Sequence, residues 1–419
     1  MQVTILALGS RGDVQPCVNL GAGLRAAGHS VHLVTFEAFR TLAQAADLQF
    51  SPIRGDVRQM VGPAGKVLIA STVNVLRMWK GILSSLGQLR QTLPSDLDGL
   101  AWAETDVLVN QLPGCLYGYD LAERYGVRLY RAATIPLART RTFPMLAFPK
   151  VFAGLPGYNA LTYRLAEQIV WSGFGPSIDR WRSQTLNRRP WGWGGPFDRM
   201  ERDRVPILAG ISPQVVSRPP DWGDHIHMTG YWYPPEGGPP RDEGLIRFVE
   251  SGAAPVFFGF GSMPVSDPTR TTGLLLDALR RTGRRAVLQA GWAGLGLAEL
   301  PANVYPIAEA DYGWLFPRMS VIVHHGGSGT TSEGLRAGVP AVIVPFVFDQ
   351  FYWGERVAEL GVGPRPIPYR RLTARRLAEA IEAAAGDDAM RGRAQSLAQR
   401  LRADVGVDGT VKLLEADTG

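Results

Sequence analysis

Short apolar, β-branched runs recur along the chain, and most of them end in a glycine-rich turn that leads into a helical pattern. The first run, Gln2–Leu8, is followed by the turn Gly9–Asp13, by a helix from Val14 to Ala27, and by a second run at Ser30–Thr35. Runs without alternating polar positions indicate strands buried on both faces, as in parallel sheets. This repeat predicts right-handed βαβ units and hence an α/β fold with a doubly wound parallel sheet.

The same pattern predicts more strands in the first half, at Phe50–Pro52, Asp106–Asn110, Val127–Tyr130 and Ile207–Ile211. Two stretches depart from it. Residues 66–93 have a helical pattern but are apolar on nearly every side, which predicts a helix that is buried or that contacts an apolar ligand. Residues 135–158 are rich in Pro, Gly and aromatic residues, and we expect them to form loops that line a cleft.

After Pro219 a passage rich in Pro and Gly interrupts the pattern, and the repeat then starts again. We expect strands at Pro255–Gly259, Ala286–Ala290, Val304–Ile307, Val321–Val323 and Ala341–Val344, with helices at Thr269–Arg281, Ser332–Ala337, Leu372–Ala385 and Met390–Arg402. A chain of 419 residues is also too long for one compact core. We therefore predict two doubly wound, Rossmann-like domains, residues 1–219 and 241–399, joined by a linker at 220–240 and followed by a terminal segment, 400–419.

Composition excludes several classes of protein. Of the residues 45% are hydrophobic and 20% charged, as in a soluble globular protein, and the net charge of +6 comes without a dense tract of Lys and Arg, which argues against nucleic-acid binding. Two cysteines, Cys17 and Cys115, fit neither a disulfide framework nor a metal site, so a cytoplasmic location is expected. No apolar run reaches the ~18–20 residues of a membrane span, and the start lacks the pattern of a signal peptide.

The stretch Val321–Gln350 carries the clearest chemistry. A predicted strand ends in two histidines and the turn Gly326–Thr331, and a helix follows. A glycine-rich turn between the carboxyl end of a strand and the amino end of a helix favours a phosphate, because backbone N–H groups there lack partners and the helix dipole is positive. The stretch therefore predicts a phosphate-binding site.

Five short motifs narrow the prediction: Gly9–Pro16 (GSRGDVQP), Phe258–Met263 (FGFGSM), Trp314–Pro317 (WLFP), His324–Thr331 (HHGGSGTT) and Pro345–Gln350 (PFVFDQ). They resemble the sterol 3β-glucosyltransferase and antibiotic (macrolide, glycopeptide) glycosyltransferase branch of the family-1 glycosyltransferases. The resemblance implies a GT-B fold, with the nucleotide sugar on the C-terminal domain and the acceptor on the N-terminal domain. It also implies transfer without metal or cofactor, inversion of the anomeric carbon, and a terminal helix in 400–419 that packs back on the N-terminal domain.

On matching positions, the resemblance assigns most of the donor site. The diphosphate-binding positions are His325, Gly327, Ser328, Gly329 and Thr330. Glu333 matches the residue that holds the ribose hydroxyls, and Asp349 with Gln350 matches the pair that binds the sugar. Alternatives remain for three of them, because His325 could instead cap the end of a strand, Glu333 is also a favourable acid in the first turn of a helix, and Asp349 is also a helix N-cap.

Three further positions complete the predicted donor site. Ser262 is a candidate for a phosphate or ribose contact, with a simple turn as the alternative, and Trp292 is a candidate for stacking on the base. Ile307 stands where related plant enzymes have a tryptophan, so we expect base recognition through the backbone near Ile307. Because of this departure, the sequence does not decide whether the base of the donor is uracil or thymine.

Asp13 matches the position of the catalytic base in this branch, in the loop after the first strand. An alkyl hydroxyl is too weak an acid to be deprotonated in advance, so the base has to accept the proton as the C–O bond forms. The alternative is that Asp13 caps the helix that starts at Val14.

The acceptor is less well specified, because residues 55–220 match no motif. Trp79 in the apolar helical stretch, together with the aromatic residues Phe143, Phe148 and Trp171, favours a hydrophobic acceptor, with core packing as the alternative. An apolar rim with nearby Arg leaves peripheral membrane contact open, without an integral membrane span.

The sequence thus predicts an inverting, UDP-sugar-dependent hexosyltransferase that moves glucose from UDP-glucose to a hydroxyl of a lipophilic acceptor, sterol-like or polyketide-like. The first alternative is a dTDP-deoxysugar donor, as in antibiotic tailoring. A nicotinamide oxidoreductase is disfavoured, because Gly9–Gly12 does not fit G-x-G-x-x-G. A sensor that binds a sugar nucleotide without turnover is the remaining alternative.

Overall fold

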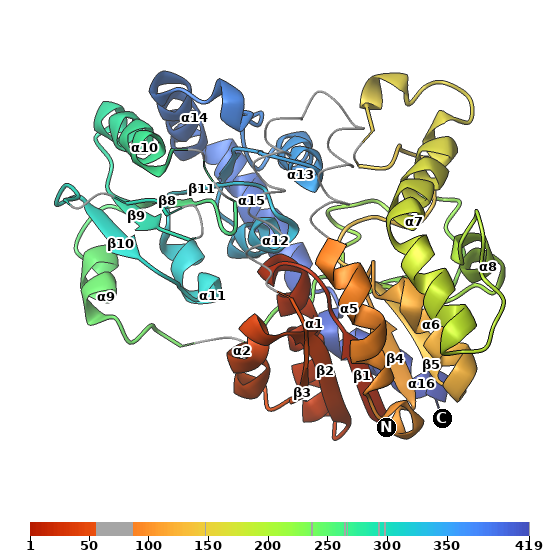
Figure 1. The fold of residues 1–419 in the computed structure, drawn as a ribbon. Helices are drawn as coiled ribbons and strands as arrows, with labels where there is room; N and C mark the ends of the chain where they lie inside the picture. The colour runs from red at the N-terminus through yellow and green to blue at the C-terminus, as the bar shows by residue number, and fades with distance from the viewer. Residues whose placement is uncertain are drawn as a thin grey trace. The chain divides into compact units, whose positions relative to one another are not determined.

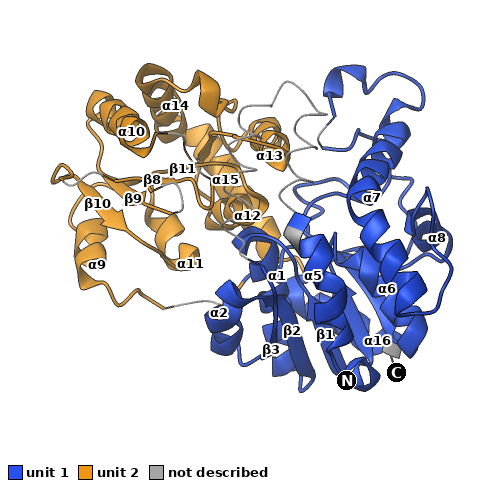
Figure 2. Cartoon of the chain, in the orientation of Figure 1, with its two compact units in different colours: residues 1–233, 405–419 blue, residues 234–404 orange. Residues whose placement is uncertain are grey.

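The structure, a computed structural model, describes residues 1–55, 87–146, 148–235, 238–263, 265, 267–291, 294–296 and 299–418. The chain divides into two compact units (Figure 1, Figure 2). Unit 1 spans residues 1–233 and 405–419, and unit 2 spans residues 234–404. Each unit holds one parallel sheet with helices packed around it, which confirms the predicted α/β fold with two doubly wound sheets.

The sheet of unit 1 has seven parallel strands in the order β3-β2-β1-β4-β5-β6-β7. They are β1 (Gln2–Leu6), β2 (Ser30–Phe36), β3 (Gln49–Ile53), β4 (Val107–Asn110), β5 (Arg128–Ala133), β6 (Ile207–Ala209) and β7 (Ile226–Met228). Strand β1 lies between β2 and β4, with Leu6 opposite Val34 and Asn110. The strand order reverses between β1 and β4, and the carboxyl ends of the strands at such a point are the usual binding position in an open α/β sheet.

The helices of unit 1 include the chain's C-terminal segment. They are α1 (Arg11–Ala26), α2 (Arg40–Ala45), α5 (Gly87–Asp98), α6 (Cys115–Tyr125), α7 (Tyr158–Gln184), α8 (Phe197–Arg202) and α16 (Gly406–Thr418), with short 3-10 turns η1 (Glu37–Phe39), η2 (Trp102–Glu104) and η3 (Lys150–Phe152). Helix α16 packs on α1, where a Cβ at Gly23 would collide with Val407. The indole N–H of Trp232 also donates to the hydroxyl of Thr410 in α16, at 2.9 Å.

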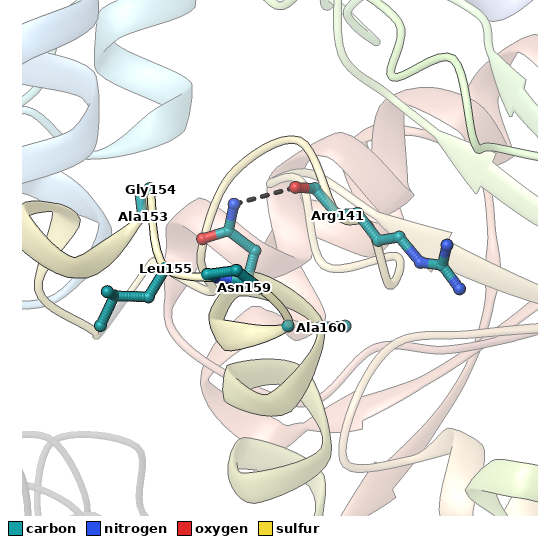
Figure 3. Close-up of a pocket in the computed structure, with 8 residues that line it drawn as sticks. Arg141, Ala153, Gly154, Leu155, Asn159 and Ala160 are labelled. Atoms are coloured by element: carbon teal, nitrogen blue, oxygen red, sulfur yellow. Dashed lines mark hydrogen bonds between the residues drawn. The ribbon is translucent and has the colours of Figure 1, made fainter.

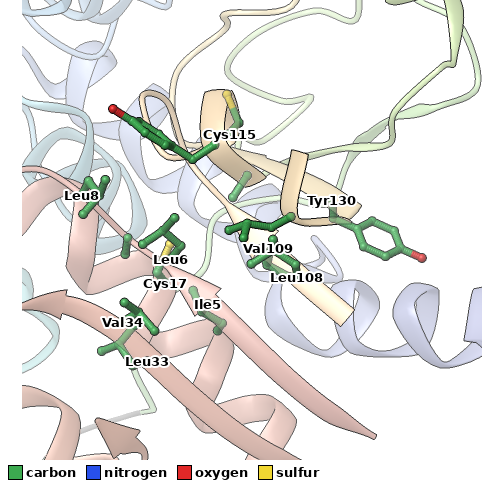
Figure 4. Packing of buried hydrophobic residues seen from close by; sticks show 14 of the residues in the cluster. Ile5, Leu6, Leu8, Cys17, Leu33, Val34, Leu108, Val109, Cys115 and Tyr130 are labelled. Carbon is green, nitrogen blue, oxygen red and sulfur yellow. The ribbon is translucent and has the colours of Figure 1, made fainter. Parts of the chain in front are cut away.

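The core of unit 1 is built around β1 and its two neighbours (Figure 4). Side chains from β1, β2 and β4 meet residues of α1 and α6; among them are Ile5, Leu6, Leu33, Val34, Leu108, Val109, Cys17 and Cys115. Both cysteines are buried free thiols. This packing fixes the start of α1 against the carboxyl end of β1.

The sheet of unit 2 has five parallel strands in the order β10-β9-β8-β11-β12. They are β8 (Val256–Gly259), β9 (Ala286–Gln289), β10 (Val304–Ile307), β11 (Val321–His324) and β12 (Ala341–Ile343). The helical segments are α9 (Glu243–Glu250), α10 (Pro268–Thr282), α11 (Tyr312–Leu315), η4 (Phe316–Arg318), α12 (Ser328–Ala337), α13 (Asp349–Glu359), η5 (Tyr369–Arg371), α14 (Ala374–Gly386) and α15 (Asp388–Arg402). Apolar residues of β8, β10 and β11 pack with α9 and α11 in one cluster.

Two expectations need correction, and one helix was missed. Part of the expected linker, 220–240, belongs to unit 1 and contains the strand β7, because Ile226 pairs with Ile207 of β6. Unit 1 correspondingly runs to Tyr233 rather than ending at 219, and it takes up the chain again at Val405 rather than at 400. The long helix α7 was not expected from a segment that contains Gly173, Gly175 and Pro176.

Candidate active site

In unit 2, the turn after β11 leads directly into α12, whose N-cap is Gly327. The first backbone hydrogen bond of the helix runs from the N–H of Thr331 to the carbonyl of Gly327, at 2.9 Å. The N–H groups of Ser328, Gly329 and Thr330 therefore have no acceptor within the helix and lie at its positive end. The helix starts four residues earlier than predicted, so that three of the predicted diphosphate positions, Ser328, Gly329 and Thr330, lie in its first turn and Gly327 is its N-cap.

His325 lies beside this turn and is held by two glycines. A Cβ at Gly261 would lie 2.9 Å from Cε1 of the imidazole, and a Cβ at Gly327 would collide with Nε2. Burial lowers the pKa of His325 to about 4, so the ring is neutral at pH 7. Its Nδ1 is buried and has no hydrogen-bond partner among the described residues. The ring therefore has hydrogen-bonding capacity to offer a ligand.

His324, the last residue of β11, has a structural contact instead. It is fully buried, and its Nδ1 accepts a hydrogen bond from the N–H of Gly326 at 3.1 Å. Burial lowers its pKa well below the ordinary value for histidine. A neutral His324 thus supports the turn that presents His325 and the start of α12.

Glu333 lies in the second turn of α12, not in the first as the sequence suggested, and is largely buried. Burial raises its pKa to about 7; the positive charge of Arg336 opposes this shift and the negative charge of Asp311 adds to it. The guanidinium of Arg336 lies 3.9 Å from Oε2, and this oxygen accepts no hydrogen bond within the described parts of the chain. A ligand with two hydroxyl groups would supply the missing donors.

Both residues of the predicted sugar-binding pair, Asp349 and Gln350, make hydrogen bonds within the protein. Gln350 is buried, its Oε1 accepts from the N–H groups of Phe346 (2.8 Å) and Val347 (3.1 Å), and its Nε2 contacts the sulfur of Met263. Asp349 is the first residue of α13 rather than its N-cap, which is Phe348, and its Oδ2 accepts from the indole N–H of Trp353 at 3.2 Å. Gln350 thus shapes the loop, whereas Asp349 remains partly exposed.

The other predicted donor-site positions are Ser262, Ile307 and Trp292. Ser262 is partly exposed in the turn after β8, next to Gly261. Ile307 ends β10, and its carbonyl accepts from the N–H of Ala290 at 3.1 Å. Asp311 is structural, since it caps α11 through the N–H of Gly313. Trp292 lies outside the described residues.

In unit 1, Asp13 is the third residue of α1, and Ser10 is the N-cap. Asp13 is therefore neither a loop residue nor the cap of a helix at Val14. Its Oδ2 accepts from the N–H of Ser10 at 2.8 Å and from the Ser10 hydroxyl at 3.0 Å. Burial raises the pKa of this carboxyl above its ordinary value, and the two hydrogen bonds oppose that rise. The carboxylate also lies so close to Gly9 (φ +150°) that a Cβ there would collide with it.

Sequence reasoning missed two residues near these groups. Gln111 follows β4 at the carboxyl edge of the sheet, its Nε2 donates to the carbonyl of Asp13 at 3.1 Å, and its buried Oε1 has no partner among the described residues. Thr331, one position after the predicted Thr330, has a buried hydroxyl that is likewise unpartnered there. A polar residue directly after a buried strand was the available signal for Gln111.

The structure describes three of the predicted acceptor residues, Phe143, Phe148 and Trp171. Trp79 lies outside the described residues, as does the helical stretch 66–93 up to residue 86. Phe143 and Phe148 are both partly buried in the segment before α7. Trp171 is buried in the core, where its indole N–H donates to the carbonyl of Gly192 at 2.7 Å, as the core-packing alternative expects.

A pocket of about 550 Å³ lies at the amino end of α7 (Figure 3). Its lining residues are Arg141, Ala153, Gly154, Leu155, Pro156, Gly157, Asn159 and Ala160. The amide of Asn159 donates to the carbonyl of Arg141 at 2.9 Å, which ties the preceding loop to the helix. None of the predicted site residues lines this pocket.

No helix within the described ranges combines the length and the apolar character needed to cross a bilayer.

Both units match known protein families. Residues 3–144 match the glycosyltransferase family 28 N-terminal domain, and residues 274–416 match the C-terminal domain of erythromycin biosynthesis protein CIII-like proteins. A sterol 3-beta-glucosyltransferase of Cryptococcus neoformans is 33% identical over 446 residues, which cover 100% of this chain and 27% of the fungal protein. One of Arabidopsis thaliana is 34% identical over 426 residues and covers 98% of this chain, which spans 65% of the plant protein.

Solved structures agree on the fold. The glycosyltransferase of kitacinnamycin superposes with a TM-score of 0.68 at 18% identity, covering 100% of this chain and 99% of its own. Glycosyltransferase VinC, solved in complex with DTDP, gives 0.62 at 19% identity with coverage of 100% and 99%. The chain thus has the GT-B fold, with a glycosyltransferase family 28 N-terminal domain and a C-terminal domain of the erythromycin biosynthesis protein CIII-like type, and along its whole length it is similar to sterol 3-beta-glucosyltransferases.

Proposed function

We propose that the chain transfers glucose from UDP-glucose to a hydroxyl of a sterol-like acceptor, with inversion at the anomeric carbon and with Asp13 as general base. The observation that carries the proposal is the cluster at the start of α12. There, the N–H groups of the first turn, a neutral His325 with an unpartnered Nδ1, and the under-bonded carboxylate of Glu333 occur within nine residues. These are the groups that a nucleoside diphosphate needs.

Diphosphate departure requires stabilisation of developing negative charge. The first-turn N–H groups of α12 and the imidazole of His325 supply hydrogen-bond donors, and the helix dipole adds positive potential. Glu333 accepts from the ribose hydroxyls, and Asp349 accepts from a sugar hydroxyl. Gln350 acts indirectly, by holding the loop that carries Asp349. Metal-free transfer remains a prediction, which chelation tests below.

Transfer proceeds as one in-line displacement. The acceptor oxygen attacks the anomeric carbon, the bond from that carbon to the diphosphate oxygen breaks, and the hydroxyl proton passes to the carboxylate of Asp13. Ser10 already occupies Oδ2 of this carboxylate, so Oδ1 is the oxygen we assign to the proton. The raised pKa suits a base that has to receive a proton late in the step.

The acceptor class follows from the relatives, which are named for 3-beta-glucosylation of sterols. A test incubates the purified chain with UDP-glucose, UDP-galactose or a dTDP-sugar, each with a sterol, a macrolide aglycone or a phenol, and reads product mass and anomeric configuration. The dTDP-sugars are included because a backbone contact near Ile307 suits uracil and thymine equally. We expect a β-glucoside of the sterol from UDP-glucose, at a rate that EDTA leaves unchanged.

Two results would overturn the proposal. Tight UDP binding without a glycoside from any pair would indicate a sensor that binds sugar nucleotides. A product only from dTDP-sugars would move the donor assignment to the antibiotic-tailoring type.

A further inference from the structure

Exposed large apolar side chains gather on one part of unit 1. Outside this part, the described residues include only two of them, Tyr125 and Val405. The six that gather are Val151, Phe152, Leu155, Leu161, Leu165 and Trp193, with exposures up to 81% at Val151 and 84% at Trp193. Single exposed apolar residues are ordinary, but a contiguous group indicates a contact surface.

These residues form a continuous strip along α7. The rings of Phe152 and Tyr158 pack edge to face at 5.8 Å, and Tyr158, Leu161 and Leu165 follow at the spacing of one helix face. One turn further, the side chain of Gln168 donates to the carbonyl of Trp193 at 3.1 Å, which places the Trp193 loop beside the same face. The part on the helix is about 15 Å long, and Figure 1 shows the η3 turn at its amino end. We call this surface the α7 strip.

Within the segment that forms the α7 strip, the exposed charges have one sign, and two carboxylates from elsewhere in unit 1 lie near them: Asp198 near Arg164 and Asp221 beside Arg141. Between residues 141 and 193 five basic residues are exposed: Arg141, Lys150, Arg164, Arg180 and Arg189. The segment contains only two acidic residues. Glu167 is paired with Arg139 at 2.5 Å, and Asp179 accepts from the N–H of Trp191 at 2.7 Å. The exposed charge of this segment is therefore positive throughout.

We propose that the α7 strip binds the surface of an anionic lipid bilayer. Aliphatic and aromatic side chains at the tip of the η3 turn, with the indole of Trp193, suit insertion at the headgroup boundary, and the basic residues suit anionic headgroups. The pocket of Figure 3 adjoins the strip, since Leu155 belongs to both. Its Asn159 has an Oδ1 without a hydrogen-bond partner within the described residues, which suits the hydroxyl groups of a glycerol headgroup.

The first test measures co-sedimentation with vesicles of phosphatidylcholine, with and without phosphatidylglycerol. We expect binding that requires phosphatidylglycerol and weakens with added salt. The double variant Phe152→Ser/Trp193→Ser should lower partitioning at least about fivefold. Its matched control, Tyr125→Ser/Val405→Ser, changes the two exposed apolar residues outside the strip and should bind as the unaltered chain does. Circular dichroism and UDP affinity verify that both variants are folded, so the test does not depend on turnover.

The second test changes charge alone. Arg164→Glu/Arg189→Glu should reduce binding to the anionic vesicles about as strongly as Phe152→Ser/Trp193→Ser does. The control Arg281→Glu/Arg375→Glu, in unit 2, should leave binding unchanged. Absence of binding at low ionic strength would overturn the proposal, and so would equal binding of the strip variants and their controls. The strip could instead be covered by a second copy of the chain, and analytical ultracentrifugation tests this. If the chain is a dimer, and if Phe152→Ser/Trp193→Ser converts it to monomers without changing vesicle binding, the strip is a self-association surface and the lipid assignment is refuted.

Discussion

Burial shifts the pKa values of two side chains near the start of α12, His325 and Glu333, and so sets their charge at pH 7. His325 is neutral at pH 7 because burial lowers its pKa to about 4, and Glu333 is only partly ionised there because burial raises its pKa to about 7. In the folded chain Glu333 holds its proton more tightly than in the unfolded chain. Stability is therefore lost as pH rises from about 4.5 to about 7, by about 3 kcal/mol. A ligand that donates to the carboxylate would recover part of this cost.

Uridine binding should therefore depend on pH through Glu333. In the proposed site the ribose hydroxyls donate to the carboxylate of Glu333 and not to the carboxylic acid, so affinity should rise about tenfold between pH 6 and pH 8. Uridine is the suitable ligand because it lacks phosphates that titrate in this range. Calorimetry of the unaltered chain and of Glu333→Gln provides the measurement. The variant should bind weakly at both pH values, and a pH dependence that survives in it would disprove the assignment.

His325→Ala should weaken binding of the diphosphate without weakening binding of the nucleoside. If the imidazole donates only to the diphosphate, as proposed, its loss should lower affinity for UDP about tenfold and leave affinity for uridine the same. Titration of both ligands against the variant checks this split. Equal losses for UDP and uridine would indicate that the imidazole only supports the fold.

Among the elements, the junction of β11 and α12 shapes the proposed diphosphate site, because glycines there leave room for the ring of His325. Gly327→Ala keeps an allowed backbone conformation (φ −63°) but places a methyl group against Nε2 of His325. We expect UDP affinity to fall at least about tenfold, because the imidazole has to move. Gly392→Ala in α15 is the matched control, since a Cβ there meets no atom within 4 Å.

An unchanged UDP affinity in Gly327→Ala would mean that the position of the imidazole does not matter. The control should bind UDP normally and gain slightly in stability, as expected when alanine replaces glycine inside a helix.

Sequence patterns predicted the elements whose signal is local, such as a buried apolar strand or a glycine-rich turn. The buried runs at β1, β8 and β11 and the glycine turn before α12 have local signals, and the structure places His325 and Gly327 at that turn as expected. The α7 helix was missed because its glycines and Pro176 hide the helical pattern. The internal bonds of Gln350 could not be predicted either, since they depend on how the loop 345–350 turns back on itself.

At the scale of the whole molecule, the chain's two termini belong to the same unit. Helix α16 completes unit 1, where Leu414 is fully buried and Leu413 beside it only partly so. Leu414→Ala should lower the free energy of unfolding of this unit by about 2–5 kcal/mol, and Leu413→Ala by clearly less. Urea unfolding of both variants makes the comparison. Equally small losses would show that α16 contributes little to unit 1.

Asp13 is the residue proposed to accept the proton in sugar transfer, rather than only to close the first turn of α1. The direct measurement is the kcat of Asp13→Asn with UDP-glucose and a sterol, beside its UDP affinity. Asp387→Asn, at the N-cap of α15, is the control for the loss of a capping carboxylate. We predict that kcat falls at least about 100-fold in Asp13→Asn with UDP affinity kept, while Asp387→Asn loses stability but not turnover. Turnover of Asp13→Asn within about threefold of the unaltered chain would contradict the account.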